Sequence, residues 1–211
     1  MCFSISLSAK AVTVKNRYGV DLPENSVSGT NISAFTHPKL PVLVEPAIFI
    51  SMNWGLVPLW VKSREQAKEI QNKTLNARSE TVFEKPSFKD SAQNKRCIIP
   101  VTSFQEWHHH SDKSKTKYDI QLKDEDVFSL AGIWSKWTGP ASGKEYLSFS
   151  IITCPANPLM AEIHNSKQRM PVILSKEDEE IWINPLIEKN ILQALLVPFD
   201  ETKMEATLAA W

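Results

Sequence analysis

Short strand-like runs at irregular spacing dominate this chain of 211 residues. Residues 3–8 alternate apolar and polar side chains, a pattern typical of a strand with one buried face. Similar runs lie at residues 42–50, 52–57, 96–102, 117–122, 127–134, 146–153 and 170–174. Their irregular spacing argues against a doubly wound parallel sheet and predicts an α+β fold with many short strands.

Few segments have helical character, and all of them are short. Residues 62–72 predict a polar surface helix that Ser63 opens as a cap. Ser175 begins a capping-box pattern, which predicts a helix that runs to Ile183. Further helices are predicted over residues 79–83, with Ser79 or Thr81 as the cap, over 157–163 and over 184–196.

The bulk composition limits the classes of function. The length suits a single domain over residues 1–211 with a substantial core. Lys+Arg and Asp+Glu both number 24, so the net charge is zero, whereas a general polyanion binder is basic. We therefore expect any contact with nucleic acid to be a local patch that touches few phosphates.

Targeting and membrane signals are not evident in the sequence. The N-terminus lacks a charged region followed by an apolar run, and no apolar stretch reaches the roughly 18 residues of a membrane-spanning helix. Cys2, Cys97 and Cys154 are far apart and lack C-x-x-C spacing, which argues against a disulfide framework or a structural zinc site. We expect a cytoplasmic protein, and in the absence of an oligomer signal we expect a monomer.

The run His108-His109-His110 is a weak candidate for a metal site. Adjacent residues point in different directions, and no acidic or cysteine partner stands at ligand spacing. We expect a solvated polar loop over residues 108–115, and neither a metal nor another cofactor.

Cys2 is the candidate nucleophile, because it follows the initiator Met1. Methionine aminopeptidase removes Met1 when the next side chain is small, which leaves a free α-amine and a thiol on one residue. The amine of such a 1,2-aminothiol condenses with an aldehyde to an imine, and the thiol then closes a thiazolidine ring. The dipeptide alone also fits a small residue that follows Met1 by accident. The strand predicted directly behind Cys2 would fix this end of the chain inside the fold.

Asn76 and Arg78 are candidates for substrate contacts. They stand two apart in a predicted turn, so both side chains can face one cavity. The planar guanidinium of Arg78 fits a phosphate with two hydrogen bonds. The alternative is a helix cap with a surface arginine.

Glu106 and His164 are candidates for proton transfer. Alternation places Phe104 and Glu106 on one face of an extended segment, and a buried carboxyl there would have a raised pKa. His164 follows the helix predicted over residues 157–163, in a position suited to proton transfer near neutral pH. The alternatives are a solvated Glu106 on an edge strand and a histidine that the helix dipole favours.

Tryptophans supply the candidate stacking surfaces. Large aromatic side chains are core residues by default, but one or two can stack on an unpaired base. The residues concerned are Trp54, Trp60, Trp107, Trp134 and Trp137.

Several motifs occur together in a fixed order between residue 2 and about residue 183. They are Cys2, Trp54-Gly55-Leu56-Val57-Pro58-x-Trp60, Asn76-Ala77-Arg78-x-Glu80-Thr81, Arg96-Cys97-(x2)-Pro100, Phe104-x-Glu106-Trp107, Ala131-Gly132-Ile133-Trp134, Ser150-Ile-Ile-Thr153 with Asn157, and His164 ahead of Arg169-Met170-Pro171-Val172-Ile173-Leu174. This combination resembles the SRAP family (SOS response-associated peptidase; abasic-site processing proteins). The family often has Gly-Arg where this chain has Phe3-Ser4, and its histidine often stands closer to the arginine than His164 does to Arg169.

The resemblance implies a single α+β domain around a bent, barrel-like mixed or antiparallel β-structure with peripheral helices. It also implies that the protein senses abasic sites in single-stranded DNA as part of the response to DNA damage. The ring-opened sugar at such a site carries an aldehyde. Cys2 would capture this aldehyde as a thiazolidine and leave a covalent DNA–protein crosslink, with β-lyase activity through the imine.

The resemblance also implies roles for the other candidates. Glu106 would move protons during opening of the sugar ring and reversal of the crosslink, and His164 would assist that transfer or stabilise the imine. Asn76 would orient the N-terminus. DNA contacts would come from Arg78, Trp54, Trp60, Trp107 and Arg169.

Two other functions remain open from the sequence. The first is a cysteine peptidase, a hydrolase that uses Cys2 with His164 and Glu106 or Asn76 and that includes removal of its own Met1. The second is a non-enzymatic module that binds single-stranded DNA through tryptophan and arginine.

Overall fold

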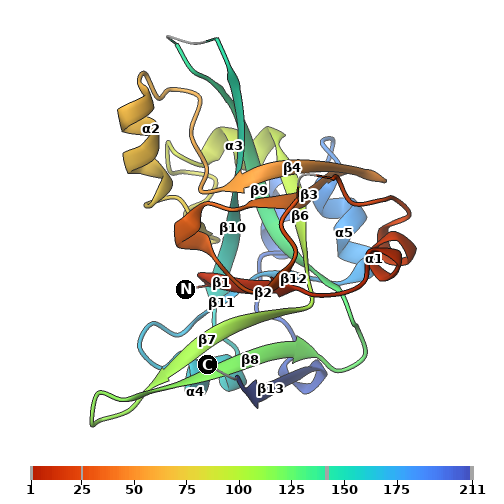
Figure 1. Ribbon diagram of the computed structural model, residues 1–211, viewed down its shortest axis with the longest axis vertical. Helices are drawn as coiled ribbons and strands as arrows, with labels where there is room; N and C mark the ends of the chain where they lie inside the picture. Colours follow the sequence, from red (N-terminus) through yellow and green to blue (C-terminus); the bar gives the residue numbers. More distant parts are fainter. Residues whose placement is uncertain (1, 25, 141–142, 210–211) are drawn as a thin grey trace.

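The computed structural model describes residues 2–24, 26–140 and 143–209 (Figure 1). Its helices are α1 (Ala11–Tyr18), η1 (Ala34–Thr36), α2 (Arg64–Gln71), α3 (Lys89–Asn94), α4 (Pro158–Ile163), α5 (Lys176–Ile183), α6 (Lys189–Ala194) and η2 (Glu201–Lys203). Its strands are β1 (Ser4–Leu7), β2 (Gly29–Ser33), β3 (Lys39–Glu45), β4 (Ile48–Trp54), β5 (Asn76–Arg78), β6 (Arg96–Val101), β7 (Ser103–His109), β8 (Lys115–Leu122), β9 (Phe128–Thr138), β10 (Glu145–Pro155), β11 (Arg169–Pro171), β12 (Ile173–Leu174) and β13 (Met204–Leu208).

A closed ring of strands forms the larger part of the fold. β10 pairs with β4 in parallel, and antiparallel pairings then run from β4 to β3, β6 and β9. β9 pairs in turn with β10 along most of its length, which closes the ring. β5 and β11 add to β10, and β12 adds to β9. Closure leaves these long apolar strands without an open edge.

A second sheet packs beside the ring, with the strand order β13-β8-β7-β1-β2. β7 follows β6 after Thr102, so one chain segment passes from the ring into this sheet. A single apolar cluster includes Ile5 and Phe104 of the small sheet together with Ile98 and Phe149 of the ring. In Figure 1 α2 lies on one side of the ring, with α1 and α5 on the other. Among the described residues, no helix combines the length and apolar character that a membrane span requires.

Gly132 marks the tightest point of the ring. A Cβ at this position of β9 would lie 2.2 Å from Ile99 Cδ1 and 3.1 Å from the Ser150 carbonyl oxygen. The indole Nε1 of Trp182 donates to the carbonyl oxygens of Cys97 (3.0 Å) and Gly132 (3.2 Å), so α5 is tied to the same point. Glycine is favoured here because a larger side chain would displace the end of Ile99 and crowd the Ser150 carbonyl oxygen.

The predicted fold class is confirmed: a barrel-like, mixed β-structure is surrounded by short helices. Most predicted elements are present with shifted ends. The caps predicted at Ser63 and Ser175 are confirmed, since each side chain accepts a hydrogen bond from its helix. The strands predicted at residues 42–50 and 52–57 correspond to β3 and β4, and the turn between them lies at residues 46–47 rather than near Ser51. Strand β7 runs to His109, so the loop predicted over residues 108–115 is shorter than expected.

Two predicted helices differ from the structure. The helix predicted over residues 79–83 is wrong, because Asn76–Arg78 forms strand β5 and a series of turns follows it. Pairing with β10 satisfies this backbone and overrides the local preference of Ser79 and Thr81 for a cap. The helix predicted over residues 184–196 is shorter than expected, since only Lys189–Ala194 is helical. Helix α1 and strands β2 and β13 were not predicted from the sequence pattern.

Arg96 supports the first prediction, on stability. Its buried guanidinium donates to the carbonyl oxygens of Trp182 (2.7 Å), Asn184 (2.6 Å) and Ala92 (3.0 Å), at the ends of α5 and α3. Lysine cannot reproduce this fork, and hydrogen bonds to charged groups contribute about 1.5–3 kcal/mol each. We expect Arg96→Lys to lower the free energy of unfolding by about 2–4 kcal/mol in urea titrations. The exposed control Arg64→Lys should leave it within about 0.5 kcal/mol, and equal effects would contradict this assignment.

Candidate functional site

Strand β1 places Cys2 inside the molecule. β1 pairs with β2 through Ser4↔Ser33 on one side, and with β7 through Ile5↔Phe104 on the other. Cys2 stands two residues before Ser4 and is fully buried. The prediction that a strand fixes this end of the chain inside the fold is confirmed.

Strand register also explains the position of Glu106. Since Ile5 lies opposite Phe104 in an antiparallel pair, continuing by two residues brings Glu106 to the level of Phe3, next to Cys2. Glu106 is 4% exposed, and Phe104 on the same face is fully buried. The alternation that predicted a buried carboxyl is therefore confirmed, and the solvated edge-strand alternative is wrong because β7 lies between β1 and β8.

Burial shifts the proton affinities of this pair. Desolvation raises the pKa of the Cys2 thiol well above its ordinary value, and the nearby charge of Glu106 raises it further. Desolvation also raises the pKa of Glu106. Both groups therefore keep their protons to a higher pH than in water. Glu106 can then act as a proton donor, and the Cys2 thiol is protected from ionisation.

Asn76 connects the chain end to the ring. Its Nδ2 donates to the carbonyl oxygen of Cys2 at 2.8 Å. Asn76 belongs to β5, which pairs in parallel with β10 through Ile151↔Asn76. The side chains of Asn76 and Arg78 share one face of this strand, and Ala77 between them is buried on the other. The predicted common face is present, although a strand rather than a turn provides it.

His164 lies across from Glu106 at the end of α4. Its Nδ1 is 3.9 Å from Glu106 Oε1 and donates to the carbonyl oxygen of Arg169 at 2.8 Å. Burial lowers the pKa of His164, so the ring is neutral near pH 7 with the proton on Nδ1. In this tautomer Nε2 is the acceptor nitrogen of the ring.

The long spacing between His164 and Arg169 is closed by a tight turn. The carbonyl oxygen of His164 accepts from the amides of Lys167 (3.2 Å) and Gln168 (2.8 Å). Asn157 caps the other end of α4, where its Oδ1 accepts from the amide of Met160. Both ends of the helix are therefore fixed, and they set the position of the imidazole.

Arg169 makes contacts within the protein. Its guanidinium pairs with the carboxylate of Glu80 and donates to the Thr153 carbonyl oxygen at 2.6 Å. These bonds hold the turn of His164 against β10. The DNA contact predicted for Arg169 stays a prediction, and its 8% exposure leaves little of the side chain at the surface.

A groove of about 760 Å³ lies next to this cluster and shares Asn76 with it. Asn76 and Phe3 form part of its wall, and α2 with the turns after β5 forms the rest. Arg78 and Lys85 line it, and neither makes an ion pair within the described part of the chain. Arg78, the predicted phosphate contact, therefore lies in a groove whose wall includes Phe3, the residue after Cys2.

The three tryptophans with a predicted DNA contact occupy different environments. Trp60 lines the groove, is 46% exposed, and donates through Nε1 to the Pro86 carbonyl oxygen. Trp107 is half-buried on β7, with Lys117 Nζ 5.8 Å from its ring centroid. Trp54 has no exposed surface and stacks on Phe149 in the core. Their roles in DNA binding stay predictions, and a base could reach the ring of Trp60 as the structure stands.

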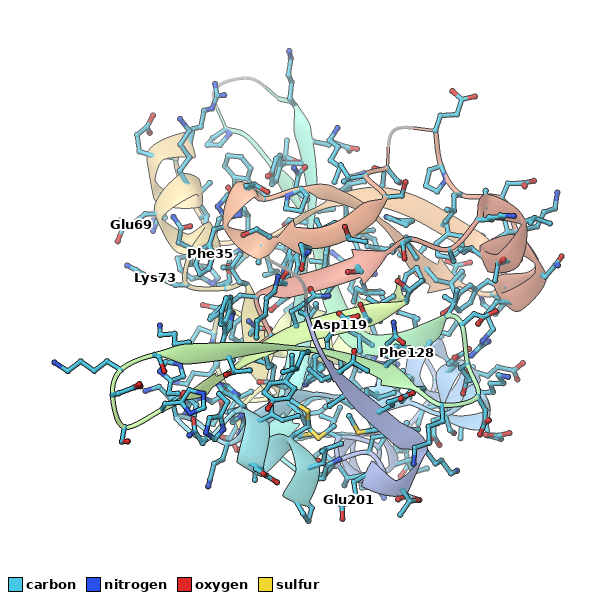
Figure 2. The ribbon with its side chains drawn as sticks, turned by 60° about the horizontal axis from the view of Figure 1, so that its bottom comes forward. Phe35, Glu69, Lys73, Asp119, Phe128 and Glu201 are labelled. Atoms are coloured by element: carbon cyan, nitrogen blue, oxygen red, sulfur yellow. The ribbon has the colours of Figure 1, made fainter. Side chains whose placement is uncertain are left out.

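The sequence pattern did not identify Gln105. This buried side chain accepts from Ser4 Oγ (2.8 Å) and donates to Ser6 Oγ (2.9 Å) and to the carboxylate of Asp119. Asp119 lies on β8 near the centre of the view in Figure 2. Alternation placed Gln105 on the face opposite Glu106, and Gln105 is only 3% exposed, so both faces of β7 are buried at this point. Gln105 thus fixes β1 against β7.

The described residues hold no cluster of three or more histidine, cysteine, aspartate or glutamate side chains arranged to bind a metal ion. What they bring together is a thiol, a carboxyl, a neutral imidazole and an amide, from the segment before β1, from β7, from the C-terminal end of α4 and from β5. Such a group can move protons to and from a carbonyl compound bound beside Cys2.

Known proteins resemble this chain along nearly its whole length. The family model described as SOS response associated peptidase (SRAP) matches residues 1–209. The abasic site processing protein YobE of Bacillus subtilis is 41% identical over 220 aligned positions, covering 98% of this chain and 93% of YobE. YoqW of the same organism, also called an abasic site processing protein, is 44% identical, covering 74% of this chain and 66% of YoqW. The chain thus spans about two thirds of the length of that relative.

A solved structure supports the same relationship. The crystal structure of a protein from Bacteroides thetaiotaomicron superposes with a TM-score of 0.92 at 43% identity, covering 99% of this chain and 92% of that one. The chain therefore belongs to the SOS response associated peptidase (SRAP) family.

Proposed function

We propose that this protein processes abasic sites in single-stranded DNA and captures them as a covalent thiazolidine on Cys2 after removal of Met1. The observation that carries the proposal is the position of Cys2. Its carbonyl is held by Asn76, and it lies beside the buried carboxyl of Glu106, which faces the neutral ring of His164. The names of the relatives YobE and YoqW support abasic sites as the substrate.

The proposed reaction begins with opening of the abasic sugar. The ring oxygen takes a proton from Glu106 or through His164, the C1′ hydroxyl loses one, and C1′ becomes an aldehyde. The α-amine of Cys2, with an ordinary pKa of about 8, adds to C1′ to form a carbinolamine. Protonation of its hydroxyl releases one water and leaves the imine.

Ring closure follows from the thiol of the same residue. The sulfur adds to the imine carbon, and the thiol proton passes to the imine nitrogen, so the step is balanced without an oxidant or reductant. Glu106 and His164 can carry this proton, since both side chains lie at the cluster. Loss of a C2′ proton from the imine, followed by loss of the 3′ phosphate, would give the β-lyase activity.

The groove supports single-stranded DNA as the substrate. Its cations Arg78 and Lys85 and the exposed ring of Trp60 suit a few phosphates and an unpaired base. The zero net charge fits a protein that reads one lesion. We expect it to act as a cytoplasmic monomer. We also expect a single domain, and the match of one family model to residues 1–209 supports this.

A cysteine peptidase is the second candidate, and the family name favours it. It would require a thiolate at Cys2, whereas desolvation raises the pKa of that thiol. The buried, protonated thiol favours the amine as the first nucleophile.

The second prediction concerns Cys2→Ala and an oligonucleotide with one abasic site. The native protein should form an adduct that survives heat and detergent on a denaturing gel. Cys2→Ala keeps the α-amine but lacks the thiol, so it should form an adduct only when borohydride reduces the imine. Cys97→Ala, which removes another buried thiol, should crosslink like the native protein. An unchanged heat-stable adduct with Cys2→Ala would overturn the thiazolidine mechanism.

The third prediction separates crosslinking from peptidase activity. Insertion of Lys between Met1 and Cys2 keeps the initiator Met in place and converts the amine of Cys2 into an amide. Crosslinking to abasic DNA should fall below detection, since an amide nitrogen does not form an imine. Cleavage of a peptide by the thiol would survive the insertion, so retained peptidase turnover would support the second candidate.

The fourth prediction concerns Glu106→Gln. Proton transfer by a positioned side chain contributes about 10²–10⁴-fold, so we expect the crosslinking rate to fall within that range. The native rate should decline as pH rises through the raised pKa of Glu106, and this limb should vanish in Glu106→Gln. Single-turnover rates across the pH range would measure both effects.

The same substitution should also change stability. Because the folded-state pKa of Glu106 is raised, its ionisation disfavours the folded state as pH rises from the unfolded-state value through the folded-state value. Glu106→Gln should therefore raise the melting temperature near pH 8 and have little effect near pH 4. The exposed control Glu162→Gln should show neither change, and a destabilised Glu106→Gln at pH 8 would contradict the assignment.

A further inference from the structure

Phe3 and Phe35 form an aromatic pair at the entrance of the groove. Their ring centroids are 5.0 Å apart, with an angle of 39° between the ring planes. Phe3 packs partly against the core and lines the groove, whereas Phe35 is 59% exposed. Phe35 therefore presents aromatic surface to solvent, with Phe3 behind it.

Backbone contacts hold the pair in place. The amide of Ala34 donates to the carbonyl oxygen of Phe3 at 2.8 Å, so η1 is tied directly to the start of β1. Ser33 Oγ accepts from the amide of Phe35, and its carbonyl oxygen accepts from Thr36 Oγ1 at 2.9 Å. The ring of Phe35 thus extends from a fixed turn, which lowers the entropy lost when a ligand stacks on it.

The pair stands next to the reactive end of the chain. Phe3 follows Cys2 directly, and the groove that Phe3 lines also contains Asn76, the partner of the Cys2 carbonyl. Figure 2 shows Phe35 at the same edge of the molecule as Glu69 and Lys73, two further residues of the groove wall. A strand with its abasic sugar at Cys2 would bring a neighbouring nucleotide to this edge.

We propose that Phe35, supported by Phe3, stacks on the base of the nucleotide immediately next to the abasic residue. This inference rests on the proposed function, because it takes single-stranded DNA as the occupant of the groove. Single exposed apolar side chains are common and need no explanation. Here the exposed ring of Phe35 packs on Phe3, which follows Cys2 and lines the groove. Arg78 and Lys85 line the same groove and make no ion pair with other described residues, which matches a base attached to phosphates.

Stacking at Phe35 would compensate for the low charge of this protein. Base–aromatic stacking is sequence-tolerant, because each base has a π-face. It also depends less on salt than a phosphate contact, since it releases no counterions. The pair would therefore hold the strand on one side of the lesion without selecting a sequence.

Binding of a stable analogue tests the proposal separately from the crosslink. A single-stranded oligonucleotide with one tetrahydrofuran residue has no aldehyde, so its dissociation constant reports binding alone. We expect Phe35→Ala to weaken binding about tenfold, within the range of roughly 5- to 150-fold for loss of one stacked base. Phe35→Trp should bind at least as well as the native protein. The exposed control Leu186→Ala, which follows α5, should leave the dissociation constant unchanged.

Removal of a neighbouring base identifies the stacked partner. Two further oligonucleotides carry a second tetrahydrofuran, one on the 5′ side of the lesion and one on the 3′ side. For the oligonucleotide that lacks the stacked base, the native protein and Phe35→Ala should have equal dissociation constants, because no base remains to stack on the ring. An unchanged dissociation constant for Phe35→Ala on the first oligonucleotide, or an equal loss on all three, would overturn the proposal.

Salt and crosslinking provide the remaining controls. The loss from Phe35→Ala should persist at raised salt, while the loss from Arg78→Ala should shrink. Phe35→Ala should still form the heat-stable adduct with an abasic site at saturating DNA, since Cys2 is untouched. Failure of the crosslink in the native protein would refute the proposed function, whereas failure of the base dependence would refute only the stacking role. Melting temperatures of the variants show whether each one is folded.

Discussion

The pairing of β1 on both of its edges is the interaction on which the candidate site depends. Chain ends usually fray unless hydrogen bonds hold them. Here β2 and β7 flank β1, Gln105 binds Ser4, and Asn76 binds the carbonyl oxygen of Cys2. Cys2 is thereby held in a fixed position inside the fold. A terminal amine can act as a positioned nucleophile only under such a constraint.

Desolvation acts in the same sense on three groups of the site. It raises the pKa of Cys2 and of Glu106 and lowers that of His164, so each side chain favours its neutral form. Neutral groups can exchange protons with a substrate without leaving a net charge buried among them. Burial of these polar groups costs stability, which the closed ring and its tie to α5 through Trp182 offset elsewhere in the fold.

The residues of the site could be predicted more fully than its geometry. Alternation along residues 104–106 correctly placed Glu106 on a buried face. The same alternation gave no reason to expect Gln105 to be buried as well, since its side chain is covered through contacts with Ser4, Ser6 and Asp119, which come from other strands. Residues 76–78 show the opposite case. Their local sequence favours a turn or a cap, yet β10 supplies backbone partners and converts them into a strand.

The sequence by itself determined the short-strand fold class, the caps at Ser63 and Ser175, and the set of groups able to do the chemistry. These follow from side-chain period and from functional-group identity, which are local properties. Only the tertiary structure decided that the ring closes between β9 and β10, that His164 faces Glu106, and that Phe35 stands exposed over Phe3. Each of these depends on contacts between segments far apart in the chain, where pairing and burial outweigh local preference.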